Sequence, residues 1–413
     1  MQDLDSAIVK LPSAHATTTV TKWTALALKA RAALYEGTFR RYHGIDGGDE
    51  YLALAADAAE TLIDEGGYKL YTAGDTPYRD LFASTEVRTD EVILARIYNL
   101  TNLASIYSNI QYSITNEVYC FSKSFMNHYL CSDGTYFSSK PGYDTMVYTE
   151  EVKDRDPRMA QTVLCPGYVQ KGETEVATVD LSKVVTGYKP IKFVMESSMD
   201  ANKKGEQYWP CFRIAEAYLV FAEAKAELGT ITQDDLDKSV NLLRRRVGMP
   251  DMNLAQANAN PDSYLKSIYP NVTFSDNTGV ILEIRRERTV ELVMEGFRRW
   301  DLLRWKEGKR MVMADTPYLG MYIEGEGTYD FDGDGTDDTA IYATTKPDGY
   351  ATTYQLSKLS LTGGTKGNMV HSLTSTYRWN EERDYLWPVP AEQRILTQGK
   401  LSQNPGWDDG LSF

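Results

Sequence analysis

The chain has 413 residues with a formal net charge of −14, and 42% of its residues are hydrophobic and 25% are charged. This composition is typical of a globular protein built as one large domain or as two to three smaller ones. The apolar stretches are short and broken by charges, so no membrane-spanning helix of about 20 residues is predicted. The negative charge argues against a broad nucleic-acid footprint.

Three arginine clusters stand against this acidic background. They are Arg244–Arg246, Arg285–Arg286 and Arg298–Arg299. Each lies in a segment of helical pattern beside glutamates, where opposite charges at helical spacing stabilise one another. The clusters therefore predict salt-bridged helices and no nucleic-acid partner.

Residues 1–97 contain the first helical pattern. Residues 20–44, "VTKWTALALKARAALYEGTFRRYHG", carry Trp23, Leu26 and Ala30 at helical spacing, and residues 50–66, "EYLALAADAAETLIDEG", are rich in alanine. Small residues on facing helices allow close packing, and glycines end both patterns. We expect a tetratricopeptide-like helix hairpin, a unit that buries its apolar face against neighbouring hairpins.

Residues 98–209 form an irregular, aromatic-rich stretch with only short alternating runs. An irregular stretch of this length is commonly functional, and its aromatic content argues against disorder. Tyrosine and tryptophan offer a flat face for a sugar ring and a polar tip for its hydroxyls. The candidate ligand-binding residues here are Tyr107, Asn109, Gln111, Tyr112, Trp209 and, on the probable turn "DGTYF", Tyr136 and Phe137.

Residues 210–316 repeat the helical design. A second hairpin is predicted from residues 212–229 and 233–248, and a third helical segment from residues 281–305, in which Gly296 permits a break. In the third segment, one helical stripe is formed by Val290, Val293, Met294, Phe297, Trp300 and Leu303. Spacing alone predicts that this stripe belongs to the core.

Residues 317–378 form a loop-rich insertion that contains "YDFDGDGTDD" at positions 329–338. Aspartates stand at positions one, three and five of an EF-hand-like loop, and a glycine stands at position six. Position twelve is Ile341 instead of a bidentate glutamate, and no helices flank the loop. We expect a structural Ca²⁺ rather than a sensor site, with candidate ligands Asp330, Asp332, Asp334, Thr336 and Asp338.

The cysteines and histidines suggest no metal or redox motif. Cys120, Cys131, Cys165 and Cys211 lack a CxxC arrangement, and the four histidines share no ligand spacing. Three pairings are open if the thiols are oxidised, with Cys120 and Cys131 the simplest, and free buried thiols are an equal alternative.

Several motifs together resemble one known family. They are "FRIAEAYLVFAEAKAELG", "VNLLRRRVGMP", "IRRERTVELVMEGFRRWDLLRWKEG" and, in the closing segment 379–413, "YLWPVPAEQRILTQGKLSQNPGW". Earlier pieces, "DAAETLIDEGGYKLY" and "RDPRMAQTVLCPGY", agree in order. The chain resembles the SusD/RagB family over almost its whole length.

This resemblance implies a mainly α fold in which tetratricopeptide-like hairpins support a loop-rich region with a few short strands. It implies a noncatalytic protein of the Bacteroidetes outer membrane that binds glycans, or peptides in RagB-like branches. The implied partner is a SusC-type TonB-dependent transporter. The resemblance also implies that Trp300, Trp305, Trp387 and Trp407 are packed, because they belong to family motifs.

The implied lipid anchor is not part of this sequence. Met1 leads directly into "QDLDSAIVKLP", without the leader and acylated cysteine that such lipoproteins carry. The cell-surface location is therefore an expectation from the resemblance alone.

Two other classes of function compete with ligand capture. A glycoside hydrolase needs two carboxylates at a fixed separation, and no segment of this sequence sets a lone acid in an apolar context. Nucleophile elbows and phosphate loops are also missing. A scaffold that binds only a protein partner through its hairpins is the second alternative.

Overall fold

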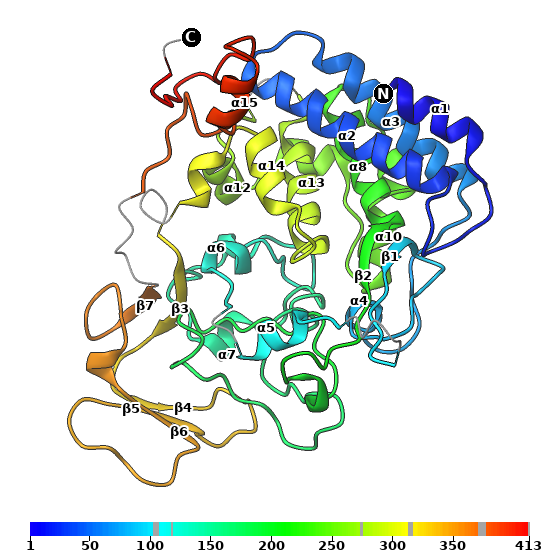
Figure 1. The fold of residues 1–413 in the computed structure, drawn as a ribbon. Coiled ribbons are helices and arrows are strands. Elements are labelled where there is room, and N and C mark those ends of the chain that lie inside the picture. The colour runs from blue at the N-terminus through cyan, green and yellow to red at the C-terminus, as the bar shows by residue number, and fades with distance from the viewer. Residues whose placement is uncertain (102–106, 117–118, 273–275, 313–316, 371–376, 412–413) are drawn as a thin grey trace.

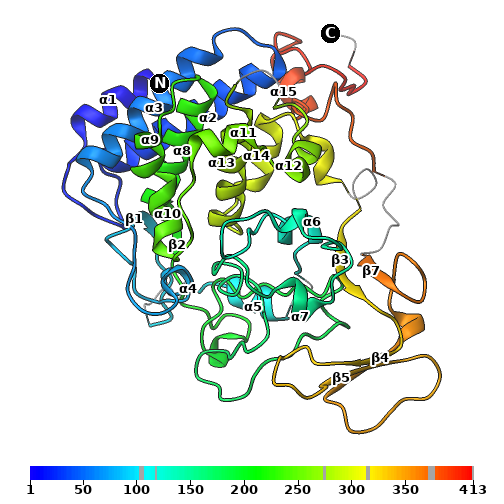
Figure 2. The ribbon, with the colours of Figure 1, turned by 180° about the vertical axis from the view of Figure 1, so that it is seen from behind.

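The computed structural model describes the chain except for residues 102–106, 117–118, 273–275, 313–316, 371–376 and 412–413. The described part is mainly helical with a few short strands, which confirms the predicted fold class. Helices gather in an upper layer in Figure 1, and loops, short helices and strands lie below it. Figure 2 shows the same two parts from behind, with both termini on the helical side.

The predicted N-terminal hairpin consists of α2 (Lys22–His43) and α3 (Gly48–Glu65). Helix α2 begins at a capping box, in which the Thr21 and Thr24 side chains bond each other's backbone N–H groups. It ends at Gly44, whose φ of 69° is the left-handed conformation that glycine adopts without strain. The two helices lie side by side, and α3 also packs along α8 (Ile214–Glu227).

The second hairpin pairs α8 with a broken return segment. The return contains α9 (Gln233–Asp237) and α10 (Val240–Arg246), separated at Ser239, where the backbone leaves the helical region. Both α10 and α13 (Thr278–Glu291) contact α8, so this hairpin is stacked between its neighbours as the repeat pattern predicts.

The third helical segment is two helices. Helix α13 ends at Glu291 and α14 (Arg298–Arg304) begins seven residues later, at an angle that places α14 against α2. In the turn between them Met294 and Gly296 both have positive φ, 61° and 88°. The break that Gly296 permits is therefore present, and it interrupts the apolar stripe predicted from spacing.

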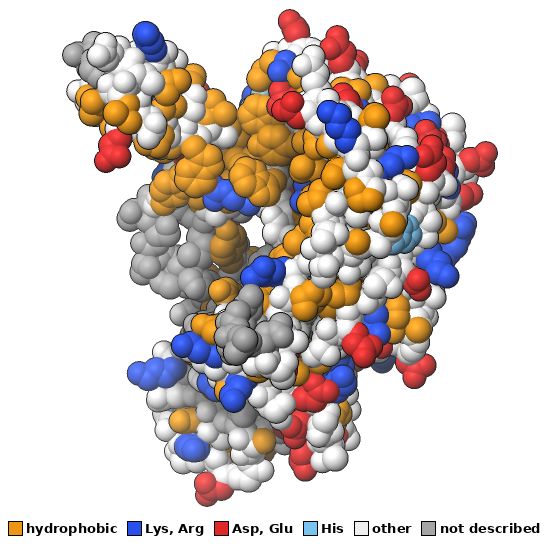
Figure 3. Space-filling model, turned by 45° about the vertical axis from the view of Figure 1, so that its right-hand side comes forward, with side chains coloured by type: hydrophobic (Ala, Val, Ile, Leu, Met, Phe, Trp, Pro, Cys, Tyr) orange, Lys and Arg blue, Asp and Glu red, His pale blue; other side chains and the backbone are white. Residues whose placement is uncertain are grey.

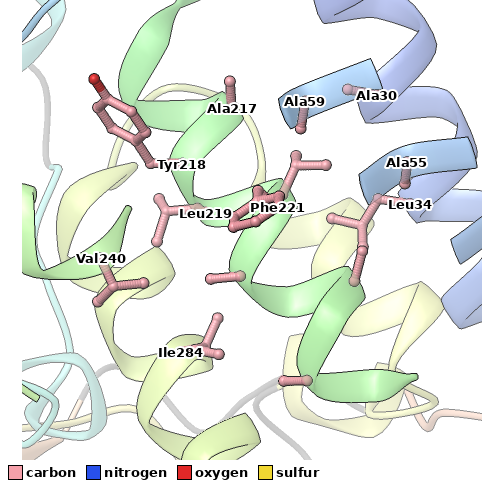
Figure 4. Packing of buried hydrophobic residues seen from close by; sticks show 14 of the residues in the cluster. Ala30, Leu34, Ala55, Ala59, Ala217, Tyr218, Leu219, Phe221, Val240 and Ile284 are labelled. Atoms are coloured by element: carbon pink, nitrogen blue, oxygen red, sulfur yellow. The ribbon is translucent and has the colours of Figure 1, made fainter. Parts of the chain in front are cut away.

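The helical core is built from small side chains on facing helices. Figure 4 shows Ala30 and Leu34 of α2 close to Ala55 and Ala59 of α3, with Phe221 of α8 beside them. All of these side chains are buried. Alanine on two faces lets the helices approach closely, and the larger leucine and phenylalanine side chains fill the remaining space.

The remaining elements are short. The other helices are α1 (Gln2–Lys10), α4 (Pro77–Phe82), α5 (Ile110–Asn116), α6 (Lys123–Met126), α7 (Tyr148–Glu151), α11 (Leu254–Ala259), α12 (Ser263–Ile268) and α15 (Ala391–Leu396). The strands are β1 (Val92–Arg96), β2 (Trp209–Arg213), β3 (Leu319–Ile323), β4 (Gly327–Tyr329), β5 (Thr339–Tyr342), β6 (Thr352–Gln355) and β7 (Gly367–Val370). Among the described residues, no helix is long and apolar enough to cross a membrane.

The strands form three small sheets. Strand β1 pairs with β2 and β3 with β7, both antiparallel, while β5 lies between antiparallel β4 and parallel β6. The aspartate loop connects β4 to β5. Strands therefore flank the loop on both sides, and no EF-hand helix pair surrounds it, as the sequence predicts.

Two of the predicted arginine clusters are salt-bridged, and most of their ion pairs lie inside the protein instead of on exposed helix faces, with Arg245 the exposed exception. Arg246 and Arg213 pair with the same carboxylate, that of Glu291. The Arg246 Nη2 lies 2.6 Å and the Arg213 Nη1 lies 2.7 Å from the Glu291 Oε1, and all three side chains are buried. Arg286 likewise pairs with Glu283 in the interior. Burying a charge requires a partner, so these ion pairs fix α10, β2 and α13 to one another.

Candidate functional site

A cleft of about 490 Å³ opens between the helical layer and the loop-rich part. One wall comes from the segment around α6, and the other from the end of α13, the following turn and the start of α14. Figures 1 and 2 both show α6 facing the lower ends of α13 and α14. A cleft of 300 to 1,000 Å³ is the size that small ligands and sugar units occupy.

Aromatic side chains form much of the apolar wall. Phe121 and Phe125 lie with ring centroids 4.5 Å apart, and both remain half-buried. Tyr318 lines the other side and donates its hydroxyl to the Met311 carbonyl at 2.8 Å. The faces of half-buried rings are the surfaces against which the C–H faces of sugars pack.

Phe297 lines the same cleft but is already covered. The guanidinium groups of Arg31 and Arg288 lie 4.9 and 5.2 Å from its ring centroid. These cation–π contacts hold the ring in place at the N-terminus of α14. Phe297 is therefore held by its two cation–π partners, while Phe121, Phe125 and Tyr318 supply the other half-buried aromatic surface of the cleft.

The polar part of the lining is basic and hydroxylic. Four arginines border the cleft, Arg288, Arg298, Arg299 and Arg310, together with Ser122 and Ser124. Arg310 donates from Nη2 to the Ser124 Oγ at 3.1 Å, and Arg298 donates from Nη1 to the Thr289 Oγ1 at 3.1 Å. These groups can donate hydrogen bonds to ligand oxygens.

His128 lies at the base of the cleft and is neutral. Its Nε2 lies 2.9 Å from the Tyr269 hydroxyl, and its Nδ1 lies 2.7 Å from the Ser124 carbonyl. Burial lowers the pKa of this imidazole well below its usual value, and the charges of Arg298 and Arg286 lower it further. His128 therefore serves as a fixed hydrogen-bonding group.

The residues predicted from the aromatic-rich stretch lie elsewhere. Tyr107 and Asn109 are half-buried beside residues 202–203: the Lys203 Nζ lies 5.7 Å from the Tyr107 ring centroid, and Asn109 donates to Asn202 at 3.0 Å. Tyr112 is half-buried on α5. None of the three borders the cleft.

Gln111 has a structural environment. Its side chain is fully buried, its Nε2 donates to the Glu196 carbonyl at 2.9 Å and to Asp200 at 2.7 Å, and its Oε1 accepts from the Met195 N–H at 2.9 Å. A buried amide satisfied in this way orders the surrounding loops. Gln111 was predicted to contact a ligand, and the structure places its side chain in the interior.

Tyr136, Phe137 and Trp209 are also tied into the fold. The Tyr136 hydroxyl donates to the Asn260 carbonyl at 3.0 Å, and Phe137 is buried under the Arg155 guanidinium at 3.5 Å. Trp209 stacks on Phe193 with centroids 5.3 Å apart. Among the described residues, no hydrogen bond or ring contact joins these side chains to Tyr107 or Tyr112.

Two tryptophans predicted to be packed are exposed. Trp300 is 48% exposed and Trp387 is 64% exposed, whereas Trp305 is fully buried as expected. The Arg299 guanidinium lies 4.7 Å from the Trp387 ring centroid and so connects α14 to the C-terminal segment. Figure 3 shows hydrophobic side chains gathered in a hollow between the C-terminal segment, residues 379–411, and the helical layer.

The aspartate loop brings part of its predicted ligand set together. Carboxylate oxygens of Asp330, Asp332 and Asp338 lie within 4.8 Å of one another. Asp334 and Thr336 are exposed and lie outside this group; Asp334 accepts from the Thr336 N–H at 2.7 Å. Burial raises the pKa of Asp332, and the charges of the neighbouring aspartates raise it further.

The four cysteines are free thiols in the described structure, and the Cys120–Cys131 pairing is not formed. Cys120 is half-buried at the edge of the cleft, and Cys131 and Cys165 are buried. Burial raises the pKa of the Cys165 thiol to about 12, so this thiol is protonated and unreactive.

Stacked helix hairpins that support a cleft bounded by loops define a tetratricopeptide-like class of helical protein. The chain belongs to the SusD family, whose sequence profile matches residues 91–407. No curated protein matches the chain.

Solved structures agree with this family in fold. A SusD-like carbohydrate-binding protein from Bacteroides fragilis is 22% identical, with 96% of this chain and 68% of that chain covered and a TM-score of 0.63. A SusD-like protein from the same species is 21% identical, with 98% and 70% covered and a TM-score of 0.63. A crystal structure with xylogluco-oligosaccharide is 18% identical, with 80% and 62% covered and a TM-score of 0.51.

Proposed function

We propose that the protein binds glycans without catalysis and that the oligosaccharide lies in the cleft between α6 and α14. The observation that carries this proposal is the lining, which combines half-buried aromatic rings with hydroxyl and guanidinium donors. Sugars present the matching pair of surfaces. Support comes from family membership and from two structural relatives, a carbohydrate-binding protein and a xylogluco-oligosaccharide complex.

The described lining of the cleft does not offer the pair of carboxylates that glycosidic hydrolysis requires. Among its described lining residues, the one carboxylate is Asp301. That side chain is buried and paired with Arg288 and Arg304, each at 2.9 Å. A glycosidase uses two carboxylates on either side of the bond, one of them protonated, so this lining favours capture over cleavage.

We further propose the cellular role that the family resemblance implies. In this role the protein sits at the outer-membrane surface and passes its ligand to a SusC-type TonB-dependent transporter. Co-purification of the transporter with the tagged protein tests the partnership. Transporter capture by a protein that binds no oligosaccharide would instead favour a scaffold, and binding of oligopeptides alone would favour a RagB-like peptide receptor.

Substitutions on the aromatic wall test the location of the site. For a glycan identified on an array, Phe121→Ala and Tyr318→Ala are each expected to weaken binding about fivefold or more, because each removes a ring face worth roughly 1 kcal/mol. Isothermal titration calorimetry measures the change. The matched controls are Tyr107→Ala and Tyr112→Ala, which change aromatic residues outside the cleft and are expected to leave the affinity unchanged.

The opposite pattern would contradict this location. If Tyr107→Ala and Tyr112→Ala abolish binding while the cleft variants bind like wild type, the ligand site is the aromatic-rich stretch around α5. Circular dichroism and thermal melting of each variant show whether it is folded before its affinity is interpreted.

We also propose that the aspartate loop binds one structural Ca²⁺ through Asp330, Asp332 and Asp338, with Asp334 and Thr336 contributing from the same loop. Three carboxylates within 4.8 Å repel one another, and a cation removes that repulsion. Calcium at 100 times its dissociation constant is then expected to stabilise the fold by about 2.7 kcal/mol.

Calorimetry on chelator-treated protein measures calcium uptake, and thermal melting measures the stabilisation. Asp330→Asn is expected to abolish uptake, whereas Asp337→Asn, at an exposed neighbour bonded to the Thr328 hydroxyl, retains it. Glycan binding is expected to survive chelation, because none of these aspartates lines the cleft. No heat of binding and no calcium by elemental analysis would rule this site out.

A further inference from the structure

Arg298 differs in its surroundings from most of the clustered arginines of the protein. Arg244, Arg246 and Arg286 each lie within 2.6 Å or less of a carboxylate oxygen. Arg298 is half-buried on the cleft wall and makes no ion pair with any carboxylate of the described residues; its Nη1 donates to the Thr289 hydroxyl. Its charge is therefore not compensated by a carboxylate of the described structure.

Arg288 adds an unused donor to the same wall. The side chain is 4% exposed, and its Nε donates to both oxygens of Asp301 at 2.9 Å. Its Nη1 is buried without a hydrogen-bond partner among the described residues. Leaving a buried, charged donor unpaired is costly, so an acceptor is expected at this position.

The carboxylate in the lining does not neutralise these groups. Asp301 is shared between Arg288 and Arg304, which leaves Arg298 outside the pair. Arg304 is itself held by Glu223 at 2.5 Å. Among the described lining residues, four arginines thus stand against the single carboxylate of Asp301, in a protein whose net charge is −14.

The arginine charges also act on His128, which lies beside them in the cleft. Besides burial, the charges of Arg298, Arg286 and Arg310 lower the pKa of His128. A carboxylate placed among these guanidinium groups would receive charge-assisted hydrogen bonds, and the planar guanidinium fork matches the two carboxylate oxygens. Sulfate esters share the charge but have tetrahedral geometry.

Building on the proposed glycan-binding function, we propose that the cleft selects acidic sugars. The carboxylate of a uronic or sialic acid unit binds to Arg298, in front of the buried Arg288 guanidinium, and the adjoining ring lies against Phe121, Phe125 or Tyr318. The overall negative charge of the protein repels polyanions at long range, so selection rests on this local arrangement and is strongest for short acidic oligosaccharides.

The test compares ligands that differ only in charge. Calorimetry is carried out with oligogalacturonate, with the same oligosaccharide after its carboxyl groups have been reduced to alcohols, and with a sulfated oligosaccharide of similar length. The acidic form is expected to bind at least tenfold more tightly than the reduced form. Equal binding of the acidic and reduced forms, or binding of the sulfated ligand alone, would overturn the carboxylate assignment.

Variants identify the residue responsible. Arg298→Gln is expected to reduce binding of the acidic ligand about tenfold and to leave the reduced ligand unchanged, while Arg298→Lys retains part of the preference. Arg245→Gln removes the same charge from an exposed ion pair with Asp251 and is the control for net charge. If Arg298→Gln weakens both ligands equally, the residue acts through the shape of the wall and the selection of acidic sugars is refuted.

Failure of the underlying function gives a different result. One outcome is that neutral oligosaccharides bind, that Phe121→Ala weakens this binding, and that acidic oligosaccharides bind no more tightly. This result would support glycan binding in the cleft and refute the selection of acidic sugars. If no oligosaccharide binds in any form, both proposals fail together.

Discussion

We expect Glu291→Gln to lower the free energy of unfolding by about 3–5 kcal/mol, because breaking a buried ion pair leaves its partner charges uncompensated. The Glu291 carboxylate is fully buried and lies 2.7 Å from the Arg213 Nη1, 2.6 Å from the Arg246 Nη2 and 3.3 Å from the Arg158 Nη1. Glutamine keeps the shape but turns an N–H₂ group toward these donors and removes the negative charge.

Urea unfolding at pH 7 measures the change. Glu36→Gln is the matched control, since Glu36 forms a partly exposed pair with Arg40 within one helix and is expected to cost less than about 0.5 kcal/mol. A Glu291→Gln protein within 1 kcal/mol of wild type would show that the buried network does not stabilise the fold.

The same carboxylate gives a pH dependence with a definite sign. Burial raises the pKa of Glu291, but Arg246, Arg213 and Arg158 outweigh burial and lower it to about 2. The folded-state pKa is thus below the unfolded value of about 4.3, so this stabilisation is complete above that value and is lost as pH falls toward 2. The stability gap between wild type and Glu291→Gln should narrow over this range.

The second large effect is expected from Gly279→Ala. Gly279 lies in the first turn of α13, where an added Cβ would sit 1.9 Å from the Ala257 carbonyl oxygen of α11. The clashing atom belongs to the backbone, so no side-chain rotation can relieve the contact. The whole of α11 would have to shift away from α13. We expect a loss of about 3 kcal/mol, at the upper end for overpacked sites.

A second glycine provides the control for Gly279→Ala. At Gly327 in β4 an added Cβ meets no atom within 4 Å, so Gly327→Ala is expected to change stability by less than about 0.5 kcal/mol. Differential scanning calorimetry of both variants makes the comparison. Equal melting temperatures for the two would mean that α11 does not pack on α13 as described.

The helical scaffold was predictable from sequence because its signals are local. Alanine and leucine at helical spacing and glycines at the ends predicted α2, α3 and α8, and the structure has these helices. The division between α13 and α14 was less predictable, because Gly296 only permits a break at that point. The break also uses a positive φ at Met294, for which the sequence gives no signal.

The cleft was not predictable because its residues come from separate segments. Phe121 and Phe125 stand in a stretch without periodicity, and Tyr318 is almost 200 residues away. The predicted candidates were chosen for being aromatic or polar in an irregular stretch, and tertiary packing buried Gln111 and Phe137. The pair Arg298–Arg299 was visible in the sequence but was predicted to be salt-bridged, whereas the described structure gives neither arginine a carboxylate partner.

The most direct test of the proposed function is a crystal structure of the protein with the tightest-binding oligosaccharide from an array. We expect electron density for a sugar unit in the cleft, with one ring against Phe121, Phe125 or Tyr318 and an oxygen within hydrogen-bonding distance of Arg298. Density for the sugar beside Tyr107 and Tyr112, with none in the cleft, would contradict it.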